Sequence, residues 1–375
     1  MSWQPGKAGC QFLPRSSSRG DKKGSFTSVP LGSATHAMGI LQDISTNILL
    51  LDGAMGTQIQ LLNLTEEDYR GEQFKDHPSP LKGNNDLLCI TRPHFIERIH
   101  LNYLEAGANI IETNTFNAQR ISLEDYKLTH IAYELNVAAA KVAVAARDKF
   151  QHENPNAPKA YVAGAIGPTS KTCSLSPDVE RPEFRAVNYN ELKSAYREQV
   201  EGLLDGGVDA ILVETIFDTL NAKAAFHAIL DVMEDRNLSA ITKENPNGDL
   251  AIMASGTITD LAGRTLSGQT AAAFAVSLEH VPLFSLGFNC ALGAEQLLPQ
   301  VLALKAFTNA YLSAYPNAGL PNAMGGYDES PETFRSKIAP FLNQPELRII
   351  GGCCGTSPAH IKALHELIHS ENNHA

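Results

Sequence analysis

From residue 48 onward, short runs of apolar residues recur along the chain, separated by longer stretches with helical spacing. The runs are continuous in hydrophobicity, which is typical of parallel strands covered on both faces. Eight such runs occur, at residues 48–51, 109–113, 161–165, 210–214, 251–255, 283–287, 310–314 and 348–351. A β-α alternation repeated eight times predicts a single-domain (β/α)₈ TIM barrel of the α/β class. An open doubly wound sheet is the alternative, but no GxGxxG sequence follows the first run.

The composition is that of one soluble domain. The chain has 375 residues, of which 43% are apolar, and a formal net charge of −11. No apolar run reaches the ~18 to 20 residues that cross a bilayer, and an acidic chain lacks the basic face that nucleic acid requires. We therefore expect a cytoplasmic protein without membrane or nucleic-acid partners. Six cysteines are too few for a disulfide scaffold.

The first 37 residues differ from the rest of the chain. They contain five Lys or Arg and one Asp, are rich in Ser and Gly, and show neither strand nor helix periodicity. We expect residues 1–37 to be a disordered leader and residues 38–375 to form the barrel. The apolar central region of a secretory signal is missing from this segment.

Three cysteines fall just after predicted strands. Cys290 follows the sixth strand, and Cys353 and Cys354 follow the eighth within a Gly-Gly-Cys-Cys-Gly sequence. The C-terminal ends of barrel strands meet at one face, so we expect the three thiols to lie together. Neighbouring residues of a regular strand point to opposite faces, and the flanking glycines, through positive φ, would let the chain turn both cysteines inward. Three soft ligands with an open fourth position predict a catalytic zinc site, whereas inert buried cysteines or a vicinal disulfide are the alternatives.

A second zinc pattern lies near the C-terminus, where His365, Glu366 and His369 match the HExxH sequence of metalloproteases. We interpret this match as accidental. The helix expected to begin at Ser357 has an apolar stripe, and at ~100° per residue Glu366 falls nearly opposite that stripe, facing solvent. A protease site also needs a third ligand, and only six residues follow His369.

An open zinc bound by three thiolates favours the activation of a substrate thiol. The metal lowers the pKa of a coordinating thiol, and the thiolate is then a nucleophile for alkyl transfer. Hydrolysis by an activated water is the alternative, although such sites favour His and carboxylate ligands. Asp52 and Glu214 follow the first and fourth strands and would hold an ammonium group, while the backbone amides of Gly53 and Gly56 would bind a carboxylate. The alternative role is a helix N-cap for Asp52 and a packed ion pair for Glu214.

The motifs around these residues resemble those of the zinc-dependent homocysteine S-methyltransferase family. They are residues 52–57 (DGAMGT), 287–293 (GFNCALG) and 351–355 (GGCCG). The resemblance implies that Cys290, Cys353 and Cys354 are the ligands of one Zn²⁺ and that homocysteine is the substrate.

The same resemblance implies a set of substrate contacts. Asp52 and Glu214 match positions that hold the homocysteine amino group, Gly53 and Ala54 match positions whose backbone amides meet its carboxylate, and Thr113 matches a further contact. Ala54 stands where the family more often has a second glycine, and its methyl group is tolerated if φ there is negative. Asn117 stands where a betaine-using relative has tyrosine, which argues against betaine as the methyl donor.

Within the family, the chain is most similar to the N-terminal homocysteine-binding module of cobalamin-dependent methionine synthase. This similarity rests on six further stretches, residues 74–77, 81–86, 112–116, 255–260, 263–270 and 315–322. It implies methyl transfer to homocysteine, giving methionine, with methylcobalamin supplied by another module or chain and with cobalamin- and folate-binding modules as partners. A free-standing methyltransferase that uses S-methylmethionine or a similar small donor is one alternative. A non-catalytic barrel that binds zinc and thiols is the other.

Overall fold

The structure is a nearly closed barrel of eight parallel strands, which confirms the predicted (β/α)₈ architecture. The computed structural model describes residues 34–260 and 262–372, so the predicted leader up to residue 33 lies outside the described residues. The barrel strands are β1 (Leu49–Leu50), β2 (Ile110–Glu112), β3 (Tyr161–Ile166), β4 (Ala210–Ile216), β6 (Leu250–Gly256), β7 (Ser285–Asn289), β8 (Tyr311–Tyr315) and β9 (Leu347–Ile350). They adjoin in the order β1-β9-β8-β7-β6-β4-β3-β2, and a parallel bridge between Leu51 and Ile110 joins the two ends of this series.

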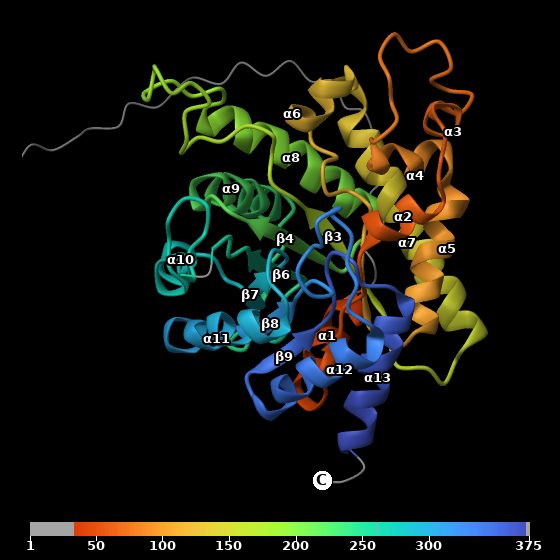
Figure 1. Ribbon diagram of the computed structural model, residues 1–375, viewed down its shortest axis with the longest axis vertical. Coiled ribbons are helices and arrows are strands. Elements are labelled where there is room, and N and C mark those ends of the chain that lie inside the picture. The colour runs from red at the N-terminus through yellow and green to blue at the C-terminus, as the bar shows by residue number, and fades with distance from the viewer. Residues whose placement is uncertain (1–33, 261, 373–375) are drawn as a thin grey trace, which may run out of the picture. The chain divides into compact units, whose positions relative to one another are not determined.

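Helices surround the strands, as Figure 1 shows. The α-helices are α1 (Ala34–Thr46), α2 (Met55–Leu61), α3 (Glu66–Arg70), α4 (Leu88–Thr91), α5 (Pro93–Glu105), α6 (Arg120–Leu123), α7 (Ala132–Glu153), α8 (Tyr189–Gly206), α9 (Thr219–Asp235), α10 (Ala271–Leu278), α11 (Ala294–Leu304), α12 (Pro331–Ile338) and α13 (Pro358–Asn372). Short 3₁₀ turns are η1 (Asn85–Leu87), η2 (Glu124–Tyr126), η3 (Thr129–Ile131), η4 (Lys305–Phe307) and η5 (Ala339–Asn343). Within residues 34–260 and 262–372, no helix has the length and apolar character needed to span a bilayer.

Three details differ from the sequence-based expectations. A two-residue strand, β5 (Ala240–Ile241), pairs with β6 and was not predicted, because two residues carry no periodicity. Strand β7 begins two residues later than the predicted run at 283–287, so Asn289 is its last residue rather than part of the following loop. Helix α1 begins at Ala34, so its first four residues come from the segment expected to be a disordered leader.

Helix α1 covers the N-terminal end of the barrel. Ile40 and Ile44 are completely buried and belong to the same apolar cluster as inward-facing side chains of the strands, such as Leu212 and Met253. The hydroxyl group of Tyr161 donates a hydrogen bond of 2.6 Å to Asp43 of this helix. The barrel interior is therefore closed at this end, and polar chemistry is confined to the opposite end, where the strands finish.

Candidate functional site

The three predicted metal ligands come together at the C-terminal ends of β7 and β9. The Sγ atoms of Cys290, Cys353 and Cys354 all lie within 4.8 Å of one another, and those of Cys290 and Cys354 are 3.7 Å apart. Zinc–sulfur bonds of ~2.3 Å in a tetrahedron separate the sulfur atoms by about 3.8 Å. The spacing and the soft chemistry of these side chains therefore fit one zinc ion.

The backbone reaches this arrangement differently from the sequence-based prediction. Positive φ occurs at Cys290 (61°) and at Ala291 (57°), where no glycine is present, and among the three neighbouring glycines only Gly355 has it (80°). Gly351 and Gly352 are needed for a different reason, because they lack a Cβ atom. A Cβ at Gly352 would lie 2.6 Å from the Thr356 side chain. The prediction that all three glycines provide positive φ was thus wrong, and the left-handed strain falls on the ligand loop itself.

Hydrogen bonds fix the position and the charge of the cysteines. The amide of Cys353 donates to the Pro316 carbonyl at 2.8 Å, and the Thr356 hydroxyl donates to the Cys353 carbonyl at 2.7 Å. Hydrogen bonds from the thiols of Cys290 and Cys353 lower the pKa of Cys354 to about 3. The same coupling raises the pKa of Cys353 well above its ordinary value.

A cavity of about 290 Å³ opens beside the cysteines. This volume is at the lower end of the range for small-molecule sites. All eight residues predicted for the site line it, namely Asp52, Gly53, Ala54, Thr113, Glu214, Cys290, Cys353 and Cys354. Its lining includes four carboxylates, those of Asp52, Asp86, Glu112 and Glu214, and no Lys, Arg or His. The cavity therefore suits positively charged ligands.

Asp52 and Glu214 take neither of the structural roles considered as alternatives. Both side chains are buried, with exposed fractions of 3% and 6%. The N-cap of α2 is Ala54, so Asp52 does not cap that helix. Neither carboxylate forms an ion pair with any described Lys or Arg. Instead, Asp52 accepts a hydrogen bond of 3.0 Å from the Glu112 amide.

Glu112 is a site residue that the sequence reasoning missed. It ends strand β2, lines the cavity and is hydrogen-bonded through its side chain to Glu214. Burial raises the pKa of Glu112 to about 7 and, together with the charges of Glu112 and Asp52, raises the pKa of Glu214 well above its usual range. The position of Glu112 near the end of a predicted strand was the signal that could have identified this residue.

The backbone predicted to bind a carboxylate lies between β1 and α2. Ala54 has a φ of −62°, so its methyl group causes no backbone strain. Its amide donates to the Thr356 hydroxyl at 3.1 Å, and its carbonyl accepts from Tyr103 at 3.2 Å. A Cβ at Gly53 would lie 2.7 Å from Thr356 Oγ1, which explains the glycine. A ligand at the Ala54 amide would have to replace its bond to Thr356.

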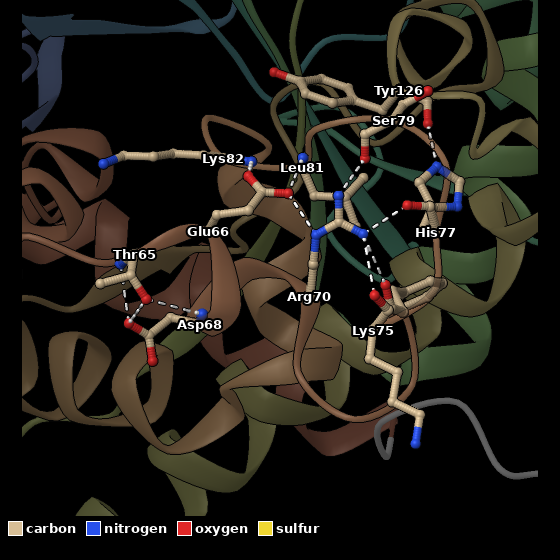
Figure 2. Close-up of polar contacts among 11 residues, drawn as sticks. Thr65, Glu66, Asp68, Arg70, Lys75, His77, Ser79, Leu81, Lys82 and Tyr126 are labelled. Carbon is tan, nitrogen blue, oxygen red and sulfur yellow. Dashed lines mark hydrogen bonds and ion pairs between the residues drawn. The ribbon is translucent and has the colours of Figure 1, made fainter.

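Arg70 anchors the long segment that follows α2 and reaches the cavity at Asn85 and Asp86. Its guanidinium donates to the carbonyls of His77 at 2.6 Å and Ser79 at 3.0 Å, and pairs with Glu66 at 2.7 Å (Figure 2). The Glu66 carboxylate in turn accepts from two successive backbone amides, at 2.8 and 2.7 Å. The planar guanidinium group of Arg70 thereby joins several turns of an irregular segment. These hydrogen bonds fix the position in which the segment reaches the cavity.

At the end of this segment, Asn85 and Asp86 are fixed by neighbouring loops. The Asn85 side chain accepts a hydrogen bond of 2.8 Å from the Tyr69 hydroxyl, and its carbonyl accepts one of 2.8 Å from Asn114. Asp86 accepts one of 2.8 Å from the Asn117 amide, and burial raises its pKa to about 7.

The HExxH residues form no second metal site with the geometry of a protease. Glu366 is exposed, opposite the buried stripe that includes Leu364 and Leu367, as predicted. The ring of His365 lies against Gly107, where a Cβ would be 2.3 Å from Nδ1. His369 Nδ1 lies 2.8 Å from the backbone oxygen of His365. Among the described residues, the cysteine trio is the group of side chains with metal-binding spacing.

The chain resembles known proteins over most of its length. A family model for homocysteine S-methyltransferase matches residues 49–368, so the chain belongs to the homocysteine S-methyltransferase family. The chain is also similar to solved structures of the homocysteine methyltransferase MmuM from Escherichia coli. The metallated form is 24% identical, with a TM-score of 0.65, and the match covers 88% of this chain and 99% of that one. The oxidized form is 23% identical, with a TM-score of 0.66 and the same coverage. These likenesses confirm the barrel fold.

Proposed function

We propose that residues 38–375 form the homocysteine-binding part of a methionine synthase and that the cavity binds zinc and homocysteine together. The observation that supports this proposal is the joining of three thiols and four carboxylates in one cavity without a basic side chain. Zinc held by Cys290, Cys353 and Cys354 would lower the pKa of the substrate thiol, so that the thiol loses its proton and remains a thiolate at neutral pH. The thiolate sulfur would then accept the methyl group to give methionine.

The carboxylates would hold the substrate by its ammonium group. Asp52 and Glu214 are the predicted partners, and Glu112 adds a third carboxylate that is hydrogen-bonded to Glu214. An ammonium group would compensate this buried negative charge and receive two or more charge-assisted hydrogen bonds. The substrate carboxylate would bind the backbone at Gly53 and Ala54, with Thr113 as a further contact.

We propose methylcobalamin, carried by another module or chain, as the methyl donor. The stretches that resemble methionine synthase outside the metal site include residues 81–86, 263–270 and 315–322, which follow β1, β6 and β8. They therefore belong to the same end of the barrel as the cavity, where a methyl carrier would approach. A cytoplasmic location, and cobalamin- and folate-binding partner modules, belong to this proposal.

A small cationic donor such as S-methylmethionine is the second candidate. The buried Asp86 carboxylate at the edge of the cavity, for which the described residues supply no ion pair, favours a cation there. Zinc-loaded protein with homocysteine should form methionine when methylcobalamin is supplied. Formation of methionine only with S-methylmethionine would overturn the cobalamin assignment and leave thiol activation intact.

A non-catalytic thiol-binding barrel is tested separately. The release of a proton when homocysteine binds to zinc-loaded protein would show that the thiol is deprotonated. Cys353→Ser is expected to abolish that release, whereas Cys173→Ser, which changes a cysteine outside the cluster, should keep it. Stoichiometric zinc with homocysteine binding and proton release, but without methyl transfer from either donor, would favour the non-catalytic alternative.

A further inference from the structure

Asn289, the last residue of β7, is completely buried and links the metal ligands to the carboxylate pocket. Its Oδ1 accepts hydrogen bonds from the Thr215 amide at 3.0 Å and from the Ser255 hydroxyl at 2.7 Å. Its Nδ2 donates to the Thr215 hydroxyl at 2.9 Å and to Cys353 Sγ at 3.8 Å. A backbone N–H can only donate, so the oxygen of the amide must face Thr215 N and the nitrogen must face the sulfur.

Thr215, which is hydrogen-bonded to Asn289, has a strained backbone conformation. Thr215 has a φ of 54°, in the left-handed region that a β-branched residue rarely adopts. The pairing of β4 with β6 also shifts in register between Val213 and Ile216. Such an irregularity redirects side chains near the end of a strand. The residues within it are Glu214 and Thr215. The two hydrogen bonds between Asn289 and Thr215 stabilise the conformation that directs Glu214 into the cavity.

The contact with sulfur acts on the other half of the site. Nδ2 lies 3.8 Å from Cys353 Sγ, and a hydrogen bond from a neutral amide stabilises a thiolate. Groups that hydrogen-bond to metal ligands fix ligand orientation, and their removal typically lowers metal affinity by ~10 to 100-fold. One amide group therefore touches a metal ligand and the backbone that orients an ammonium-binding carboxylate.

We propose that Asn289 is a positioning residue that couples the thiolate site to the pocket for the substrate amino group. The inference rests on the proposed function for the identity of the substrate. The coupling has a direct chemical purpose, since the sulfur and the amino group of homocysteine lie on one short molecule. Their two binding sites must therefore keep a fixed separation.

The test uses zinc affinity, measured by competition with a chelator, and the binding of two thiols by calorimetry. The thiols are homocysteine and 4-sulfanylbutanoate, which lacks the amino group. Asn289→Ala should lower zinc affinity about tenfold or more, and its affinity for homocysteine should fall several-fold more than its affinity for 4-sulfanylbutanoate. Asn289→Asp retains the acceptor for the Thr215 amide but loses the N–H···S contact. It should keep the preference for homocysteine while its zinc affinity changes at least threefold.

Asn136 supplies a matched control, because it is also completely buried and donates to two backbone carbonyls, each at 2.7 Å, away from the cavity. Asn136→Ala should alter stability without altering zinc affinity or the preference between the thiols. If Asn289→Ala or, should that variant not fold, Asn289→Asp leaves zinc affinity like that of the Asn136 variant, the proposal is wrong. A wild-type protein that binds both thiols equally would instead contradict the proposed function. The role of Asn289 would then be decided by zinc affinity alone.

Discussion

The carboxyl groups of Glu112 and Glu214 are hydrogen-bonded to each other, although Glu112 ends strand β2 and Glu214 lies within strand β4, and these two strands do not adjoin in the barrel. Burial raises the pKa of Glu112 to about 7 and that of Glu214 well above its usual range. Two neighbouring buried carboxylates resist ionising together unless a cation accompanies them. A positively charged ligand would therefore complete the pair, and the protonation of the pair should influence stability when that ligand is absent.

Glu112→Gln should stabilise the zinc-free protein more at pH 8 than at pH 5. The folded-state pKa of Glu112, about 7, is above its ordinary value of 4.5. The folded protein thus keeps a proton that the unfolded chain has lost, and stability falls as pH rises from about 4.5 to 7. Glutamine removes this penalty. In urea unfolding, the effect of the substitution should be about 2 kcal/mol more favourable at pH 8. An effect independent of pH would contradict the assignment.

Cys353→Ser and Cys290→Ser should each reduce bound zinc from one ion per chain to a small fraction, with the fold largely retained. The reason is that a hydroxyl group is a poor zinc ligand and the barrel core does not depend on the cysteine cluster. Metal analysis after dialysis against a weak chelator, together with circular dichroism, measures both quantities. Cys173→Ser is the control and should bind zinc like the wild type. Full zinc occupancy in the Cys290 and Cys353 variants would contradict the proposal that these cysteines bind zinc.

Gly355→Ala should cost more stability than Gly268→Ala. Both glycines have positive φ, 80° and 86°, so alanine is strained at either position, by about 1 kcal/mol. At Gly268 nothing lies within 4 Å of the added Cβ, whereas at Gly355 it would lie 2.3 Å from Tyr327 Cβ. The clash should add about 1 to 3 kcal/mol and displace the adjacent Cys354. Unfolding free energies and zinc affinities measure the difference, and equal losses in both variants would contradict it.

His100→Gln should make the protein less sensitive to acid. His100 is completely buried, neither ring nitrogen has a hydrogen-bond partner among the described residues, and burial lowers its pKa to about 4. Its unfolded-state pKa is near 6.5, so stability is present above pH 6.5 and is lost as pH falls toward 4. Between pH 8 and pH 5 the loss from this group is about 2 kcal/mol.

Comparison of unfolding at these two pH values for the wild type and His100→Gln isolates the contribution of His100. The exposed His280 offers the control, and His280→Gln should leave the pH dependence unchanged. The same pH dependence in the wild type and His100→Gln would show that His100 does not carry the effect.

The barrel could be predicted because buried parallel strands carry a local signal. Each run is continuously apolar, and the spacing between runs fits one helix, so eight repeats left little choice of architecture. The two residues of β5 carry too little of that signal to be found. The displacement of β7 has a similar cause, because Leu283 and Phe284 are as apolar as the strand they precede.

The cluster of three cysteines could be predicted from residue type and position, whereas the network around it could not. A cysteine at the end of a strand has few other roles, but Glu112 and Asn289 are common residue types whose importance depends on contacts across the barrel. Thr215 and Asn289 are 74 residues apart, and no local pattern indicates that they meet. The left-handed backbone at Cys290 was also hidden, because local propensity assigns that conformation to glycine.

In the proposed reaction, the closure of the barrel by helix α1 would set the order in which the reactants enter. Because Ile40 and Ile44 close the N-terminal end of the barrel, the cavity has its opening at the other end. If a small substrate and a large methyl carrier share one opening, only one order of binding is possible. The carrier, once bound, would block the entry of the substrate. In the proposed reaction, homocysteine binds first, and methionine leaves only after the carrier has withdrawn.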